Sequence, residues 1–347
     1  MKQRSTTVKV FAVDLAKRSF QVAGEDRHGV VVFESRYRSR EAFREFLGTL
    51  QAGQQVLMET GPGAQAWARV VQSHAARARL LPAQRVREHR SGAKNDRKDT
   101  LALLRAGRDT AIHDVPVKSV EHLALQALHR VRRGYIRRRT ALSNQMRGLL
   151  LEHGVAMARG DAALCACLSG ALADASVPLP MCLREILAEL WAEWETLGKR
   201  LARLSGQIEQ TVVHEPLAQR LMTIPGIGPI TGSAMACKEL PIERFASARQ
   251  FAASFGIVPD QHSSGESIRL GKMCKRGDRY IRSLLIEGAH AVLRRVQPEA
   301  QGNRLQRWVL RHGRRGAAVR LANRNARIAW ALLRRQTTYH TEKPSMR

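Results

Sequence analysis

The apolar pattern of this chain changes once, near Ser119, and that change limits the folds open to it. Before Ser119, stretches with an apolar residue at every second position alternate with stretches whose apolar residues recur every three to four positions. After Ser119 only the helical spacing persists, first through two long segments, 119–153 and 183–213. The pattern predicts an α/β part followed by a mainly helical part.

The N-terminal part is predicted to form a mixed sheet covered by helices. The expected strands are 8–13, 19–23, 30–34, 55–58 and 78–81. Two helices are expected: one that is capped by Ser39, and a second over 64–74. The first three strands follow one another through short polar turns, so they form an antiparallel meander. Helices and strands then alternate, which is the element order of ribonuclease-H-like domains.

The long helical segments allow two arrangements. A connector rich in Ala, Gly and Pro, 154–180, joins them. They fit equally an antiparallel hairpin within one subunit and a coiled coil that pairs subunits. Shorter helices and glycine-rich turns follow from Leu217. The predicted division of the chain is 1–115, 116–213, 214–335 and a frayed tail, 336–347.

The charge of the chain indicates a polyanionic partner. Among 347 residues, 58 Lys and Arg stand against 30 Asp and Glu, which gives a formal net charge of +28. Phosphate backbones are the usual partners of such chains, because each cationic contact releases condensed counterions. Aromatic residues make up only 5%, so phosphate contacts are expected to dominate over base stacking.

The expected location is the cytoplasm, without a membrane partner. No apolar run reaches the roughly 18 residues that a membrane helix needs, and the start of the chain lacks the apolar core of a signal peptide. The five cysteines include no Cys-x-x-Cys pair and are expected to be reduced thiols.

Four acidic residues stand where the edge of a sheet would gather them. Asp14 ends the first strand and Glu59 ends the fourth. Asp96 and Asp99 are spaced i, i+3 before a helix expected over 100–106, so they share a face. Four carboxylates this close repel one another unless divalent cations lie between them, and two Mg²⁺ ions held this way clamp the two oxygens of a phosphodiester displacement. Each acid alone is explained equally well as a helix cap or a solvated strand end. The joint pattern of all four is a much more specific indication of a metal site.

A glycine-rich turn in the C-terminal part has two interpretations. Gly226 and Gly228 lie in Ile-Pro-Gly-Ile-Gly-Pro before a short helix of small residues. The turn fits a helix-hairpin-helix element, in which glycines let the backbone and the N–H groups of the next helix approach a phosphate. It fits a plain tight turn between packed helices about equally well.

Residues 258–267 are predicted to form a polar loop that contains serines, and a basic stretch follows it. An exposed hydroxyl beside a glycine suits attack on a phosphodiester, because nearby cations stabilise the charge that develops. Ser263, Ser264 and Ser267 cannot be ranked from the residues alone, and His262 is taken as a surface histidine. The cations expected to contact nucleic acid are Arg269, Lys272, Lys275, Arg276 and Arg279.

Taken together, these motifs resemble those of the IS110 family of insertion-sequence transposases. The residues that carry the resemblance are Val-Asp-Leu-Ala-Lys around Asp14, Met-Glu-Thr-Gly around Glu59, and Lys-Asn-Asp-Arg-Lys-Asp over 94–99, the last most similar to the IS1111 branch. The resemblance covers nearly the whole chain. It implies a RuvC-like Asp-Glu-Asp-Asp domain that holds Mg²⁺, and a nucleophilic serine directly before a glycine, which here is Ser264 with Gly265.

The resemblance also implies the reaction and its partners. The expected enzyme is a transposase that cuts and exchanges strands of donor and target double-stranded DNA through a transient phosphoserine. A structured guide RNA (bridge RNA) from the same element, and a dimer or tetramer with a composite site between subunits, are expected partners. Two alternatives remain: a metal-dependent, RuvC-like junction endonuclease without a covalent intermediate, and a non-catalytic basic binding protein.

Overall fold

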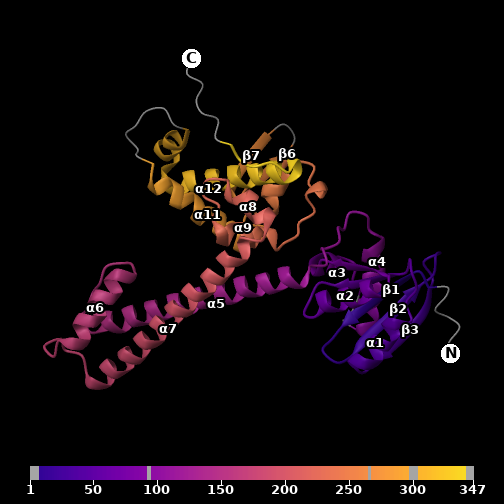
Figure 1. Cartoon of the computed structure of the whole chain (residues 1–347), viewed down its shortest axis with the longest axis horizontal. Helices are drawn as coiled ribbons and strands as arrows, with labels where there is room; N and C mark the ends of the chain where they lie inside the picture. The colour runs from indigo at the N-terminus through magenta and orange to yellow at the C-terminus, as the bar shows by residue number, and fades with distance from the viewer. Residues whose placement is uncertain (1–7, 92–94, 265–266, 297–303, 341–347) are drawn as a thin grey trace, which may run out of the picture. The chain divides into compact units, whose positions relative to one another are not determined.

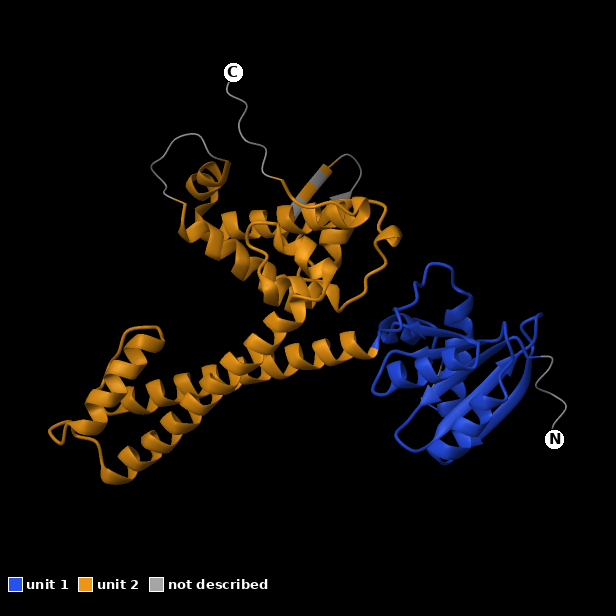
Figure 2. Cartoon of the chain, viewed as in Figure 1, with its two compact units in different colours: residues 1–119 blue, residues 120–347 orange. Residues whose placement is uncertain are grey.

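The structure is a computed structural model that describes residues 8–91, 95–264, 267–296 and 304–340. The chain divides into two compact units, 1–119 and 120–347 (Figure 2). The coarse expectation, a mixed sheet with helices followed by a mainly helical part, is confirmed. The finer four-part division stays a prediction.

The first unit is built on a five-stranded sheet in the order β3-β2-β1-β4-β5 (Figure 1). The strands are β1 (Val10–Leu15), β2 (Phe20–Glu25), β3 (Val31–Tyr37), β4 (Gln55–Glu59) and β5 (Arg77–Leu81). The first three pair antiparallel, while β4 runs parallel to both β1 and β5. The strands therefore lie close to the predicted ranges.

Helices cover both faces of this sheet, because the central strands carry apolar residues on both of their faces. The helices are α1 (Arg40–Gly48), α2 (Ala64–Ser73), α3 (Ala83–Glu88) and α4 (Asp96–Arg108). On one face Phe11 and Phe20 pack with Phe43, whose ring stacks on that of Phe20 at 4.3 Å. On the other face Ala12 and Leu57 pack with α4. Ser39 caps α1 as expected, its hydroxyl accepting from the N–H of Ala42.

The second unit begins with an antiparallel hairpin of α5 (Val120–Glu152) and α7 (Met181–Val212), which lie side by side in Figure 1. Both helices belong to one chain, which is the first of the two predicted arrangements; pairing of subunits stays a prediction. The connector holds a further helix, α6 (Asp161–Ala173), which the sequence analysis did not predict. Leu164 and Leu168 of α6 pack into the core of the hairpin.

The rest of the second unit packs around α12. Its elements are α8 (Pro216–Met222), α9 (Pro229–Ala236), the 3-10 turn η1 (Ile242–Arg244), α10 (Ala248–Ser254), β6 (Pro259–Ser264), β7 (Ser267–Met273), α11 (Arg279–Arg294) and α12 (Arg304–Arg335). The expectation of a polar loop over 258–267 was wrong, since β6 and β7 pair antiparallel as a hairpin. No helix in the described part of the chain combines the length and the apolar character needed to cross a bilayer.

Candidate functional site

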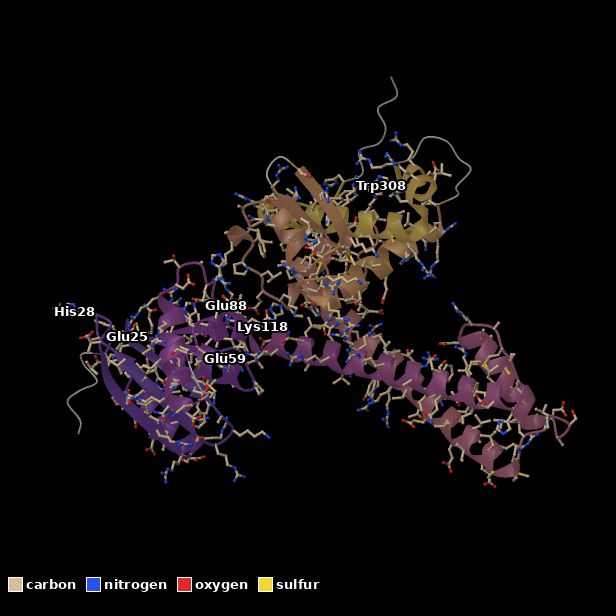
Figure 3. All side chains as sticks on the ribbon, turned by 180° about the vertical axis from the view of Figure 1, so that it is seen from behind. Glu25, His28, Glu59, Glu88, Lys118 and Trp308 are labelled. Atoms are coloured by element: carbon tan, nitrogen blue, oxygen red, sulfur yellow. The ribbon has the colours of Figure 1, made fainter. Side chains whose placement is uncertain are left out.

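Two of the predicted acids lie side by side at one edge of the sheet. Val13 on β1 stands opposite Met58 on β4 in a parallel pair, so the next residues, Asp14 and Glu59, follow on the same face of neighbouring strands. Glu59 ends β4, whereas Asp14 is the last residue but one of β1. Figure 3 labels Glu59 in the first unit. Its carboxylate is about a quarter exposed. The register of the sheet thus places the two acids on neighbouring strands, and their role as a metal site stays a prediction.

The other two acids lie in the first turn of α4. This helix begins at Asp96 rather than at residue 100, because the side chain of Asn95 caps it by accepting from the N–H of Arg97. Asp99 is only 6% exposed, whereas Asp96 is exposed and lies 3.5 Å from Arg36. Ion pairs between the start of α4 and β3 thus fix Asp96 near the outer part of the site.

The other three predicted acids act electrostatically on Asp14, and the four together are called the carboxylate cluster. Burial raises the pKa of the Asp14 carboxyl, and the negative charges of Asp99, Asp96 and Glu59 raise it further. Asp14 therefore lies in a region of negative potential to which the other three predicted acids contribute. Asp96 itself is exposed and pairs with Arg36.

A cation that the sequence analysis did not predict lies inside this cluster. The guanidinium of Arg90 lies 2.9 Å from Glu59 Oε2 and 3.1 Å from Asp99 Oδ1. Its positive charge also opposes the rise in the pKa of Asp14, although that pKa remains raised overall. Arg90 follows α3, in the basic sequence Arg-Glu-His-Arg, and no periodic pattern distinguishes it from its neighbours.

Arg90 changes how the acids relate to a metal ion. Among the described residues, no group of three or more His, Cys, Asp or Glu is arranged to hold a metal ion. The donors nevertheless suit a hard divalent cation, because they are carboxylates with an excess of negative charge. The single positive charge of Arg90 partly neutralises Glu59 and Asp99, the role that a bound cation would otherwise have.

The candidate serine lies in the second unit, on the hairpin. Ser264 ends β6 and pairs with Ser267 at the start of β7. Only its backbone is described here, and Gly265 lies outside the described residues. His262 is 77% exposed on the same strand, 3.7 Å from Asp260. The hairpin therefore presents the predicted serine beside its turn.

The predicted cations follow the serine along β7 and the segment up to α11. Arg269 lies opposite His262 in the hairpin. The side chains of all five predicted cations are exposed: Arg269, Lys272, Lys275, Arg276 and Arg279. The neighbouring Arg282 is buried and donates to the carbonyls of Phe255 and Lys275, so its role is to hold this segment on α11.

The glycine-rich turn has a protein partner. The carbonyl oxygen of Gly226 would lie 1.8 Å from a Cβ added at Gly288 of α11, so both residues must be glycine for the elements to meet. Gly226 also has φ +93°, a conformation that side chains disfavour. Gly228 is exposed at the start of α9 with open space around it. Packing accounts for Gly226, while a phosphate contact at Gly226 or Gly228 stays a prediction.

Comparison with known families gives two matches that together span both units. Residues 11–154 match a family described as Transposase, of the Asp-Glu-Asp-Asp IS110 type. Residues 218–305 match the family described as Transposase IS116/IS110/IS902 family.

Several known proteins are similar over nearly the full chain. A probable family 20 transposase of Pseudomonas aeruginosa is 44% identical, over 94% of this chain and 97% of its own. The transposase for insertion sequence element IS1111A of Coxiella burnetii is 35% identical, over 96% of this chain and 91% of its own. The transposase for IS1328 of Yersinia enterocolitica is 34% identical, over 96% and 98% of the two chains.

Proposed function

This chain belongs to the IS110 family of insertion-sequence transposases, and from that premise we propose that it exchanges DNA strands through a phosphoserine formed at Ser264. A transposase of this family cleaves and joins DNA, and its Asp-Glu-Asp-Asp nuclease domain implies a divalent metal. The observation that supports the metal part of the proposal is the placement of Asp14 and Glu59 on neighbouring parallel strands, with Arg90 in contact with both Glu59 and Asp99.

The carboxylates would hold Mg²⁺, with two ions as the proposed number. Bound Mg²⁺ lowers the energy of the charge that develops on phosphate oxygens. Asp14 and Glu59 approach from the strand ends, and Asp99 from α4. Arg90 would leave its position between Glu59 and Asp99 when these oxygens turn to a metal. We assign the unit a RuvC-like, ribonuclease-H-like fold on its element order and sheet topology.

The serine step conserves the energy of the phosphodiester. Ser264 Oγ forms a bond to phosphorus, the bond from phosphorus to the leaving strand oxygen breaks, and the serine proton is lost while the leaving oxygen gains one. The hydroxyl of the exchanged strand then attacks the phosphoserine and releases Ser264. Cations on β7 such as Arg269 lie near enough in sequence to offset the negative charge of the pentavalent phosphate.

The proposal includes partners that direct the reaction. A guide RNA from the same element would choose the donor and target double-stranded DNA, so the protein itself would bind mostly backbone phosphates. This fits a net charge of +28. A dimer or tetramer would place the acids of one subunit beside the serine of another. The turn that includes Gly226 and Gly228 would act as a helix-hairpin-helix contact to phosphate at the start of α9.

A recombination assay tests the serine step. The protein is incubated with the element's ends, its flanking RNA and Mg²⁺, and protein–DNA adducts that survive denaturant are resolved on a gel. Wild type and Ser267→Ala are expected to give an adduct, and Ser264→Ala and Asp14→Asn to give none. Strand cleavage that persists in Ser264→Ala but is lost in Asp14→Asn would instead establish a metal-dependent junction endonuclease.

A further inference from the structure

A large groove in the second unit lies between the β6–β7 hairpin and α12. Its volume is about 1030 Å³. One wall is formed by Pro259, Gly271 and Lys272 of the hairpin, and the other by residues of α12. Figure 3 labels Trp308 on α12, one of the lining residues. The groove therefore begins on the same hairpin that carries Ser264.

The α12 wall is shaped by a break in the helix. Gly313 has φ +65° and ψ 168°, which are not helical angles, so α12 consists of two arms. The first arm lines the groove with Arg304, Trp308 and His312, spaced four residues apart on one face. The second arm lines it with a stripe of three arginines: Arg320, Arg324 and Arg327.

The lining is strongly cationic. In the part of the groove that the structure describes, the lining contains Lys272, the four arginines 304, 320, 324 and 327, and no Asp or Glu. None of these cations forms an ion pair with a carboxylate of the described residues. Slight burial and the charges of Arg320 and Arg311 lower the pKa of His312. The groove thus carries uncompensated positive charge that suits an anionic ligand.

The spacing of these cations suits a linear polyanion. With a rise of about 1.5 Å per residue, Arg320, Arg324 and Arg327 are separated by about 6 Å and about 4.5 Å along the helix. A row of charges at such intervals can contact successive phosphates of one strand. Trp308 is half-buried, with Ile328 also in the lining, so the groove adds an aromatic and apolar surface on which a base can stack.

The size of the groove favours a narrow occupant. Its volume of about 1030 Å³ is close to that of clefts that hold small ligands, so it suits a short stretch of one strand better than a duplex. A basic groove with an aromatic residue is the usual design of sites for single strands.

We propose that this groove binds a single strand of DNA, with phosphates on Arg320, Arg324 and Arg327 and a base on Trp308. The choice of DNA rests on the proposed function, because a strand attacked on the hairpin must be separated from its duplex nearby. The residues of the site are distinct from the carboxylate cluster, which lies in the other unit.

Fluorescence anisotropy tests the groove without catalysis. A labelled 12-nucleotide single strand of DNA, the RNA of the same sequence and the matching duplex are titrated with full-length Ser264→Ala protein in EDTA. Arg324→Gln and Arg327→Gln are expected to weaken binding of the DNA single strand about tenfold each and to reduce the salt slope by about 0.7. Arg315→Gln, an exposed arginine of α12 outside the groove, is the matched control and is expected to change binding less than twofold.

A second pair of variants tests the stacking. Trp308→Leu is expected to weaken single-strand binding at least fivefold, and Trp308→Phe, which keeps a ring, to restore most of it. Thermal melting of each variant checks the fold. Equal losses of single-strand affinity in Arg315→Gln and Arg324→Gln would overturn the proposal. So would groove variants that weaken the binding of RNA or of duplex more than that of the DNA single strand.

The two proposals fail in different ways. Groove-dependent binding of the DNA single strand without any serine adduct in wild type would reject the phosphoserine and keep the groove. If wild type forms the serine adduct but single-strand binding does not depend on Arg324 or Trp308, the groove is rejected and the phosphoserine is kept.

Discussion

The guanidinium of Arg90 lies 2.9 Å from the carboxylate of Glu59, an acid that we propose as a metal ligand. The same guanidinium pairs with the buried Asp99. Arg90 therefore partly neutralises both acids, and a divalent cation bound between them, as proposed, would displace its positive charge.

Removal of that charge should strengthen metal binding. Arg90→Met is expected to bind Mg²⁺ at least about tenfold more tightly, because a unit charge about 4 Å away contributes some 4 kcal/mol at an effective dielectric constant of 20. Isothermal titration calorimetry measures the affinity. Arg85→Met, which removes only an exposed ion pair with Glu88, serves as the control. Weaker Mg²⁺ binding in Arg90→Met would mean that Arg90 helps to position the carboxylates.

Neutralising Asp14 should stabilise the metal-free protein. The raised pKa means that the folded protein keeps this proton to higher pH than the unfolded chain, so the stability it contributes is complete below pH 3.8 and is lost as the pH rises through the folded value. Asp14→Asn is expected to be more stable than wild type at pH 7, by less than about 1 kcal/mol because solvent screens a partly exposed carboxylate, and to lose any stabilisation by Mg²⁺. Thermal melts with EDTA and with Mg²⁺ measure both effects, and a Mg²⁺ shift of wild-type size in the variant would exclude Asp14 from the metal site.

Buried His129 should make the second unit sensitive to mild acid. Its ring contacts the Tyr280 hydroxyl at 3.0 Å and Ser233 Oγ at 3.1 Å, and burial lowers its pKa to about 4, with smaller effects of Arg132 and Lys238. The unfolded chain gains a proton near pH 6.5 and the folded protein does not, so stability is lost as the pH falls from 6.5 towards 4.

The loss from this histidine should reach up to about 3 kcal/mol. Urea unfolding at pH 7.5 and pH 4.5 is expected to show a smaller difference in His129→Gln than in wild type. His214→Gln removes an exposed histidine of the same unit and should leave the difference unchanged. An equal pH dependence in His129→Gln and wild type would show that other groups cause the acid sensitivity.

The contact between Gly226 and Gly288 should tolerate no side chain. Gly288→Ala is expected to destabilise the protein by about 3 kcal/mol, because its Cβ would overlap the carbonyl oxygen of Gly226. Gly148→Ala is the matched control, since Gly148 is helical, exposed and surrounded by open space. It should be stabilising by about 0.5–1 kcal/mol. Denaturant unfolding compares the two, and similar losses in both would contradict the packing interpretation.

Local patterns predicted the sheet and the long helices well. Alternating apolar residues and polar turns placed all five strands of the first unit, and the strand-end rule placed Asp14 beside Glu59. The alternation is a local property of each strand, whereas the placement of Asp14 near Glu59 also needed the parallel pairing of β1 with β4 that the element order suggests. Helical spacing likewise placed α5 and α7, although the partner of each helix was left open.

Features that depend on distant contacts were missed. Helix α6 is apolar on most sides, so it lacks the polar face that distinguishes a helix from a loose connector. Strand β6 has the sequence Pro-Asp-Gln-His-Ser-Ser, so no period-2 alternation marks it and the hairpin was taken for a loop. Arg90 acquires its place only through its distant partners Glu59 and Asp99, and nothing in its own sequence records them.

The break at Gly313 has a geometric consequence for the arm that precedes it. No atom lies within 4 Å of where a Cβ on Gly313 would be, so backbone angles alone set the bend. The arm Arg304–His312 is about 13 Å long, and a rotation of about 15° at Gly313 moves its far end by about 3.5 Å. Arg320, Arg324 and Arg327 lie beyond the bend and keep their places on the core. Leu305, Trp308 and Val309 of this arm pack against the core of the unit, so the width of the opening is coupled to that packing as well as to the two torsion angles of Gly313.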